Sequence, residues 1–440
     1  MRTFILTTVA ILLCAVGLTR AEDRLTAAQI DSNLSSFDQV WTTIKDKHFD
    51  TTFGGNDWNA LKLQYRPVVE TASTMRDARN AIGAMLAHLG VSHCSILPKD
   101  AYEGLGGGRT GDGTIGVEIR LIDDRPVVFR MLPNSPASEV GVRPGWEIVR
   151  IGNEETAPVL KRVADAFGQK LAREYYLTAA ISNRLKGPIG DSLKVTFLDD
   201  RDSSIEKSIR LTERTGREVR LSNLPPYRLR VSIDTLENGI GYFAHTVFLD
   251  PTFLMPRYDS AIQAFEHSPG LIIDIRGNPG GIGMLGVGMA GALVNEKDKF
   301  LGTMITRNAQ LKFVLNPRIP SFNGPVALLV DALSASTSEI FAGGLKDIGR
   351  VRVFGSRTVG AALPAMIDAL PNGDAFMHPM ANYISFSGKA LEASGVVPDA
   401  EVPLTREALL SGMDPALDAA IKWIESQYPD MKSGSTKIGD

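Results

Sequence analysis

Three serines spaced two residues apart form the first group in this sequence that could do covalent chemistry. Ser334, Ser336 and Ser338 follow a short apolar run at residues 326–330 and open a pattern of helical spacing. This order predicts a buried strand, a turn of small residues and a helix, whose N-terminal N–H groups stabilise negative charge. A serine placed there can be a nucleophile, with a neighbouring amide holding the oxyanion. Ser336-x-x-Glu339 is also a capping box, which needs no chemistry.

The segments around these serines predict the domain that carries them. Apolar runs alternate with helical patterns from about residue 225 onward; the runs are 241–247, 271–275, 326–330 and 351–354, and the helical patterns are 253–265, 285–294 and 337–348. Such alternation predicts a mainly parallel sheet with ligands at the strand ends. We assign residues 225–407 to this α/β core, and residues 408–440 to a last helix and a polar tail.

Two further units precede the core. Residues 22–105 carry apolar positions at helical spacing and end in a glycine-rich connector, which predicts an N-terminal helical domain. Residues 106–215 show strand patterns, and residues 133–145 read P-N-S-P-A-S-E-V-G-V-R-P-G. This stretch resembles the signature of PDZ domains, which bind an extended peptide C-terminus by strand addition. The resemblance places the carboxylate-binding loop at Ile115, Gly116 and Val117; a β-barrel spacer without a ligand is the alternative.

Four motifs in this order resemble the tricorn-core and C-terminal-processing family of serine endopeptidases. They are the PDZ signature, Asp274–Gly281, Ser334–Gly344 and Glu392–Asp399. The resemblance covers nearly all of the chain after its first 21 residues. It implies a multidomain α/β protein with an N-terminal helical cap, a PDZ-like β-barrel domain and a crotonase/ClpP-like βα core with a mainly parallel sheet.

By this resemblance Ser336 is the nucleophile. Thr337 N–H would donate one hydrogen bond to the oxyanion, and an amide of Gly280 or Gly281 the second, because glycine lets the backbone approach the substrate closely. The processing branch activates its serine with a lysine in a turn after the next strand. This chain has Ala361 in that place, so the resemblance implies a different base.

The tricorn branch uses a Ser-His pair before the PDZ domain and a glutamate near the end of the core. This chain has Ser92-His93 and Glu392. An imidazole titrates near neutral pH and can take the serine proton. The glutamate, through the Ser92 hydroxyl, would fix the tautomer of the imidazole and stabilise the imidazolium.

Other side chains are weaker candidates for the base or the nucleophile. Lys346 lies about three turns along the nucleophile helix and would point away from its N-terminus. The thiol of Cys94 would face away from the site if His93 lies in a strand. The remaining histidines stand in no motif and are expected to be structural, although His245 could line the cleft. They are His48, His88, His245, His267 and His378. No metal or phosphate-loop motif is present, so we expect no cofactor.

The first 21 residues have the composition of a targeting segment. Arg2 precedes an apolar stretch at residues 5–18, and small residues suited to cleavage precede Glu22. We therefore expect a periplasmic or secreted protein without a retained membrane span. Removing Arg2 and Arg20 changes the formal net charge from −3 to −5, which disfavours a nucleic-acid partner. Cys94 is then the single cysteine and cannot form an internal disulfide.

The sequence therefore predicts a secreted or periplasmic serine endopeptidase whose protein or peptide substrate is recognised through its C-terminus. Ala361 leaves a second class open, a peptide- or lipid-binding protein without turnover, as a resemblance to interphotoreceptor retinoid-binding proteins allows. An acyl esterase built on the same residues is a third possibility. The substrate and the oligomeric state stay open.

Overall fold

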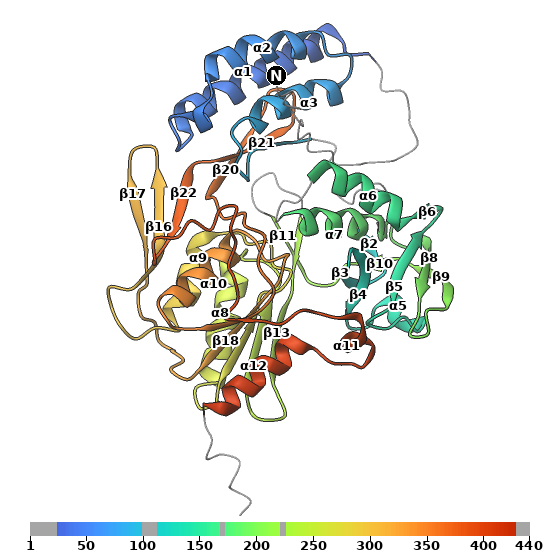
Figure 1. Cartoon of the computed structure of the whole chain (residues 1–440), viewed down its shortest axis with the longest axis vertical. Coiled ribbons are helices and arrows are strands. Elements are labelled where there is room, and N and C mark those ends of the chain that lie inside the picture. Colours follow the sequence, from blue (N-terminus) through green and yellow to red (C-terminus); the bar gives the residue numbers. More distant parts are fainter. Residues whose placement is uncertain (1–23, 99–111, 168–171, 221–225, 428–440) are drawn as a thin grey trace, which may run out of the picture.

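The computed structural model describes residues 24–98, 112–167, 172–220 and 226–427. The targeting segment predicted for residues 1–21, the glycine-rich connector and the end of the polar tail lie outside the described residues. Figure 1 shows a helical cap (blue) above an α/β core (yellow to red), with a β-rich module (green) beside the core. Within the described ranges, no helix combines the length and the apolar character needed to cross a membrane.

The helical cap contains three helices, and a side chain caps the N-terminus of each. They are α1 (Ala27–Lys47), α2 (Trp58–Glu70) and α3 (Met75–Ala87), with a short 3-10 turn, η1 (Phe53–Gly55). Thr26, Asp57 and Thr74 cap their N-termini by accepting backbone N–H groups, as these residue types do. The predicted apolar faces pack together, and Phe37 and Ile82 at their centre are fully buried.

A hairpin from the core completes the cap. Strand β1 (Ser95–Leu97) follows the cap helices and pairs antiparallel with β21 (Ala375–Pro379), which in turn pairs with β20 (Ala365–Ala369). Leu370 and Phe376 of this hairpin are buried in the cap's apolar cluster. The cap is therefore built from two segments far apart in the sequence.

The β-rich module has its own apolar core. Its main sheet has the order β3-β4-β5-β8-β9 and is antiparallel throughout. The strands are β2 (Gly113–Thr114), β3 (Val117–Ile122), β4 (Arg125–Met131), β5 (Glu147–Ile151), β6 (Glu154–Glu155), β7 (Lys186–Gly187), β8 (Ser192–Leu198), β9 (Ser204–Arg210) and β10 (Thr212–Glu213). The helices are α5 (Pro136–Glu139), α6 (Thr156–Phe167) and α7 (Arg173–Arg184).

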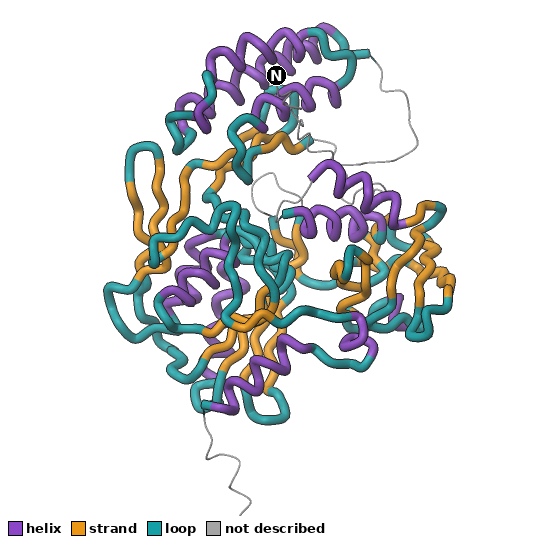
Figure 2. The backbone as a smooth tube through the Cα atoms, viewed as in Figure 1, coloured by secondary structure: helices purple, strands orange, loops and turns teal. Residues whose placement is uncertain are grey.

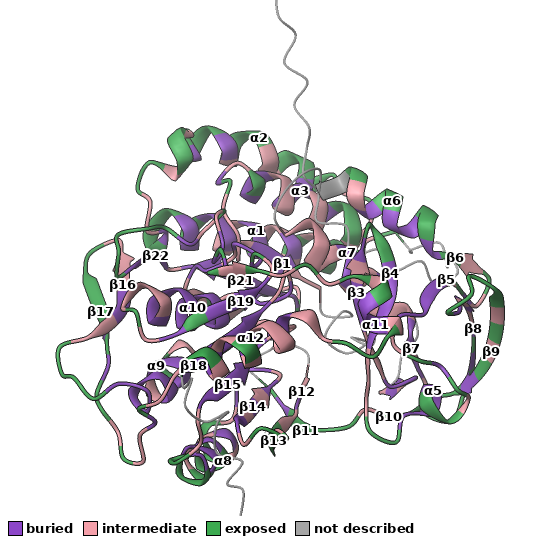
Figure 3. Cartoon of the chain, turned by 60° about the horizontal axis from the view of Figure 1, so that its bottom comes forward, coloured by how far each residue is buried: buried purple, intermediate pink, exposed green. Residues whose placement is uncertain are grey.

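A six-stranded sheet in the order β13-β14-β15-β18-β19-β23 forms the centre of the core. Neighbours from β14 to β23 run parallel, and β13 adds an antiparallel edge. The strands are β13 (Val231–Thr235), β14 (Gly241–His245), β15 (Leu271–Asp274), β18 (Val326–Val330), β19 (Arg352–Gly355) and β23 (Ala400–Glu401). Figure 3 shows β15, β18 and β19 as largely buried strands.

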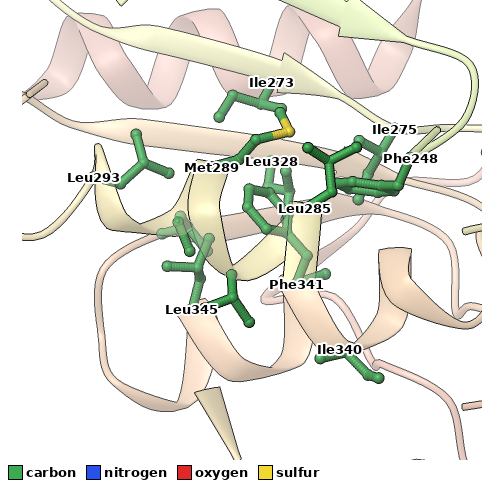
Figure 4. Packing of buried hydrophobic residues seen from close by; sticks show 14 of the residues in the cluster. Phe248, Ile273, Ile275, Leu285, Met289, Leu293, Leu328, Ile340, Phe341 and Leu345 are labelled. Carbon is green, nitrogen blue, oxygen red and sulfur yellow. The ribbon is translucent and has the colours of Figure 1, made fainter. Parts of the chain in front are cut away.

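Helices cover both faces of this sheet, as Figure 2 shows. Successive residues of a strand face opposite sides, so Ile273 packs with α8 (Pro251–Ala264), α9 (Gly283–Gly291) and α10 (Thr337–Asp347). Figure 4 shows this cluster from close by. Ile272, one residue earlier, packs in the cluster of α12 (Pro415–Ser426). Burial on both faces explains why these strands appear in the sequence as continuous apolar runs.

The remaining elements of the described residues are short strands and one short helix. A three-stranded sheet is ordered β17-β16-β22, and the remaining elements are β11 (Arg217–Val219), β12 (Tyr227–Leu229), β16 (Phe300–Thr306), β17 (Gln310–Val314), β22 (Ala381–Ser385) and α11 (Arg406–Leu410). The sequence patterns located four of the six central strands (β14, β15, β18 and β19) and α10 within a few residues, and they missed the two edge strands, β13 and β23. They predicted none of the strands between residues 300 and 385 outside the central sheet.

Candidate active site

Ser336 occupies the position that the sequence predicted, directly before α10. It is the N-cap residue of this helix and has φ 56° and ψ −118°, a backbone conformation that residues other than glycine rarely adopt. From Leu333 to Leu345 it is the one residue that keeps part of its surface exposed. Backbone strain of this kind tends to occur at functional sites, and here it falls on the one partly exposed residue of a buried turn.

The hydroxyls on either side of Ser336 have structural partners. Ser334 Oγ donates to the carbonyl of Ile275 at 2.8 Å, and Ser338 Oγ donates to the carbonyl of Asn278 at 2.9 Å. Thr337 Oγ1 donates to the carbonyl of Gly281 at 2.8 Å. These three bonds attach the loop after β15 to the start of α10.

The two glycines of this loop approach Ser336 closely. Gly280 and Gly281 have φ values of 96° and 136°, and a Cβ atom on Gly280 would lie 2.7 Å from Thr337 N and 2.8 Å from Ser336 Cβ. The Gly280 N–H donates to Asn278 Oδ1 at 2.9 Å, so it is not free for a ligand. Among the described residues, neither Gly281 N–H nor Thr337 N–H has an acceptor. Of the expected oxyanion donors, these two amides are the available pair.

Glu339 connects the start of α10 to the loop after β19. Its carboxylate is fully buried and accepts hydrogen bonds from Thr358 Oγ1 (2.5 Å), Gly360 N–H (2.7 Å), Ala361 N–H (2.9 Å) and Ser336 N–H (3.2 Å). Burial raises the pKa of Glu339 to about 7, although the four hydrogen bonds act in the opposite direction. The capping contact predicted as an alternative is therefore present, and it adds to the description of Ser336 rather than replacing it.

Ser92, His93 and Glu392 form a hydrogen-bonded chain. Ser92 Oγ lies 2.7 Å from His93 Nδ1 and donates to Glu392 Oε2 at 3.0 Å, and Ser92 N–H donates to Glu392 Oε1 at 2.8 Å. Burial lowers the pKa of His93 to about 4, so the imidazole is neutral at pH 7. Burial raises the pKa of Glu392, opposed by its three hydrogen bonds.

The loop after β19 contacts both Ser336 and the hydrogen-bonded group of Ser92, His93 and Glu392. Ala361 C=O accepts the Ser336 N–H at 2.9 Å, and Ala362 N–H donates to Glu392 Oε2 at 3.1 Å. Two consecutive residues thus contact the predicted nucleophile and the predicted glutamate. His93 also has a positive φ, 54°, and it lies in a loop rather than in a strand, because β1 begins at Ser95.

The competing side chains have other surroundings. Lys346 Nζ donates to Val397 C=O at 2.6 Å and lies 3.0 Å from Asp399. Cys94 packs against the cap's apolar cluster, where burial raises the pKa of its thiol. His245 is 2% exposed, and burial lowers its pKa to about 3. Within the described ranges, no three His, Cys, Asp or Glu side chains are placed to hold a metal ion.

His48 and His378 are buried, and His88 lies 3.1 Å from the Tyr65 hydroxyl. His378 Nε2 lies 3.1 Å from Asp368. None of these three has a contact with the chain of Ser92, His93 and Glu392 in the hydrogen bonds of the described residues.

The predicted carboxylate-binding loop connects β2 to β3 in the β-rich module. Ile115 is fully buried, and a Cβ on Gly116, which has φ 76°, would lie 2.4 Å from the Ser135 side chain. The Gly116 N–H donates to Thr114 Oγ1 at 3.1 Å. Val117, the third predicted residue, begins β3 and pairs with Met131.

The β-rich module contacts the loops of the site through an ion pair that the sequence did not reveal. Arg120 of β3 is buried and lies 2.6 Å from Asp331, the residue after β18. Asp331 also accepts the N–H of Gly277 at 2.8 Å. No sequence pattern pointed to Arg120. Asn278 stood inside a recognised motif without an assigned role, and Glu339 was predicted only as a capping residue.

Comparisons with known proteins agree with this architecture. Residues 241–402 match the profile of peptidase family S41, and residues 32–87 match that of the tricorn protease C1 domain. The chain is 28% identical to carboxyl-terminal-processing peptidase 3, chloroplastic, of Arabidopsis thaliana over 384 residues, covering 82% of this chain and 67% of the relative. It is 23% identical to tricorn protease homolog 1 of Streptomyces coelicolor, covering 88% of this chain but 34% of that relative's length.

Among solved structures, the photosystem II D1 C-terminal processing protease superposes with a TM-score of 0.56 at 21% identity, covering 90% of this chain and 97% of that one. This likeness supports the multidomain α/β fold that the sequence predicted. The predicted resemblance is also confirmed: the core of this chain matches peptidase family S41 and its cap matches the tricorn C1 domain.

Proposed function

We propose that this chain is a periplasmic or secreted serine endopeptidase that cleaves peptide bonds with Ser336, activated by His93. The family matches support a serine-type peptidase, in agreement with the sequence motifs. The relatives are named as carboxyl-terminal-processing proteases, which supports a protein or peptide substrate. The choice of residues and the location are proposals of ours.

The single observation that carries the proposal is the hydrogen-bonded chain from Glu392 through Ser92 to His93. Ser92 O–H donates to Glu392, so its oxygen is left to accept from His93 Nδ1–H. A proton on Nδ1 leaves the lone pair on Nε2, which is the nitrogen that can take a proton. These hydrogen bonds thus favour the His93 tautomer that a general base needs. They link Ser92 to Glu392, which lies 300 positions later in the sequence.

In the proposed reaction, His93 Nε2 takes the Ser336 proton while Ser336 Oγ forms a bond to the substrate carbonyl carbon. Thr337 N–H and Gly281 N–H donate to the developing oxyanion. The imidazolium, stabilised through Ser92 by Glu392, then gives its proton to the leaving amine as the C–N bond breaks. Water hydrolyses the resulting ester by the same steps, with His93 again as the base.

We further propose that the β-rich module, residues 106–215, is a PDZ-like domain that presents the substrate's C-terminal end. Its antiparallel sheet and its separate apolar core support an independent module. Ile115, Gly116 and Val117 would form the carboxylate loop, and the core, residues 225–407, would be the crotonase/ClpP-like part. The cap, residues 22–105, would carry His93, and the hairpin at residues 365–379 would complete the cap.

Site-directed variants test the assignment of the nucleophile and the base. Ser336→Ala is expected to abolish cleavage of an unfolded protein substrate and labelling by a fluorophosphonate, with thermal unfolding unchanged. His93→Ala is expected to reduce the rate of acylation roughly 10²–10⁴-fold, as loss of a general base does. His88→Ala, a histidine outside the site, is the matched control and should cleave normally.

The same experiment separates the alternatives. A binding protein without turnover would neither cleave nor react with the fluorophosphonate. An esterase would react with the probe but hydrolyse esters and leave peptides intact. Unchanged cleavage by Ser336→Ala would refute the assignment of the nucleophile.

A further inference from the structure

Asn278 is a buried side chain of the loop after β15, and both of its polar ends have backbone partners. It is 0% exposed. Its Nδ2 donates to the carbonyl of His245 at 3.0 Å, and its Oδ1 accepts the N–H of Gly280 at 2.9 Å. Its own carbonyl accepts Ser338 Oγ at 2.9 Å and Ala335 N–H at 3.1 Å. The residue therefore joins β14, the glycine loop and the turn that carries Ser336.

The bond to Gly280 decides which amide of the glycine loop is free. Two adjacent peptide N–H groups, those of Gly280 and Gly281, could each turn toward Ser336. Because Asn278 Oδ1 holds the Gly280 N–H, that donor is directed into the core. The Gly281 N–H has no acceptor among the described residues. Thr337 Oγ1, bonded to the Gly281 carbonyl at 2.8 Å, fixes the other side of the same glycine.

The Ser336 N–H cannot take the place of either donor. It is bonded to Ala361 C=O at 2.9 Å and to the Glu339 carboxylate at 3.2 Å. The usable donors are therefore Thr337 N–H and whichever glycine N–H the loop conformation leaves free. Gly280 Cα is close to both Ser336 and Thr337, because a Cβ atom on it would lie 2.7–2.8 Å from them.

We propose that Asn278 is a positioning residue for the oxyanion hole: by holding Gly280 N–H and His245 C=O at once, it presents Gly281 N–H to the substrate. The inference rests on the proposed function, since it assumes that Ser336 attacks a carbonyl. Asparagine suits the task because one short side chain must accept and donate simultaneously. Alanine does neither, and a carboxylate accepts but cannot donate, and adds negative charge near the place where an oxyanion forms.

The test compares Asn278→Ala with wild type and with Asn33→Ala. Asn33 is also 0% exposed but lies in the cap, where its Oδ1 accepts from Asn372. We expect Asn278→Ala to lower kcat by roughly 10- to 1000-fold with KM little changed, the upper end being the loss of one oxyanion donor. The control should lose stability at most, with kcat retained.

A peptide aldehyde that forms a tetrahedral adduct with Ser336 gives a readout that a merely structural role would not move. Its oxyanion occupies the proposed hole, so Asn278→Ala should weaken aldehyde binding in proportion to the loss of kcat/KM. The inference is overturned if folded Asn278→Ala keeps wild-type kcat and aldehyde affinity while Ser336→Ala is inactive. Cleavage by Ser336→Ala would instead overturn the proposed function itself.

Asn278→Asp decides the question if the alanine variant does not fold. The introduced carboxyl keeps the size of the side chain and the acceptor for Gly280, but when ionised it cannot donate to His245. We expect its kcat at pH 8 to fall below that of wild type and the deficit to shrink toward pH 5, where a protonated carboxyl donates again. A wild-type kcat and aldehyde affinity at pH 8 would refute the role of Asn278.

Discussion

Replacing Ser92 by alanine tests the proposed catalytic role of the hydrogen-bonded residues Glu392, Ser92 and His93 at their central member. The change removes the hydroxyl that lies 2.7 Å from His93 Nδ1 and donates to Glu392 at 3.0 Å. The backbone N–H of Ser92 still donates to Glu392 Oε1 at 2.8 Å, and Ala362 N–H still donates to Oε2 at 3.1 Å. The glutamate therefore stays in place, and the variant isolates the link between the carboxylate and the imidazole.

The size of the effect follows from the bond that is lost. His93 becomes an imidazolium in the transition state, and a hydrogen bond to a charged group contributes about 1.5–3 kcal/mol. Because about 1.36 kcal/mol corresponds to a tenfold change in rate, kcat should fall roughly 10- to 150-fold. KM should change little, since Ser92 is not expected to touch the substrate.

The assay is hydrolysis of an unstructured fluorogenic peptide under saturating and limiting substrate, with Ser394→Ala as the matched control. Ser394 lies two residues after Glu392, and its hydroxyl donates to Ala390 C=O, outside the chain. This control should retain wild-type kcat. If folded Ser92→Ala also retained wild-type kcat while His93→Ala was inactive, the tautomer argument would be wrong.

Three further predictions concern pH and stability. Because burial lowers the pKa of His93 to about 4 and only the neutral ring is a base, the acidic limb of kcat/KM should lie near pH 4, well below the ordinary 6.5. The pKa of Glu339 is raised from 4.5 to about 7, so its contribution to the free energy of unfolding is largest below pH 4.5 and is lost as the pH rises through 7. Glu339→Gln should remove this slope, on the order of 3 kcal/mol between pH 4.5 and 8. Asp374→Ala removes a buried carboxylate that accepts two hydrogen bonds from Arg79 at 2.9 Å and one from Asn372 at 3.0 Å, and should cost roughly 3 kcal/mol of stability.

These outcomes are measured by pH-dependent kinetics and by urea unfolding followed at several pH values. An acidic limb near 6.5 that persists in Glu339→Gln would contradict the assignment of His93. A pH slope of unfolding that is equal in wild type and Glu339→Gln would contradict the second prediction. For Asp374, the control is Asp38→Ala, because Asp38 makes partly exposed ion pairs with Lys62 and Arg66, and its loss should cost less than about 1 kcal/mol.

Local sequence patterns alone predicted where the proposed nucleophile stands. The run at residues 326–330 and the small residues after it were enough to place Ser336 at a helix N-terminus, and the structure has β18 and α10 there. Their periodicity records which faces are buried, and a strand, turn and helix follow directly from it. The roles of His93 and Glu392 came instead from the order of motifs, since neither residue stands out by its local pattern.

What only the tertiary structure decided are contacts between segments that are distant in the sequence. It joined Ser92 to Glu392, and it paired β1 with β21 to complete the cap. It also selected Gly281 rather than Gly280 as the free amide, by turning the Gly280 N–H onto Asn278. Hydropathy specifies that a residue is buried but not which partner covers it, so hydrogen bonds and strand pairings of this kind are determined by packing of the whole chain.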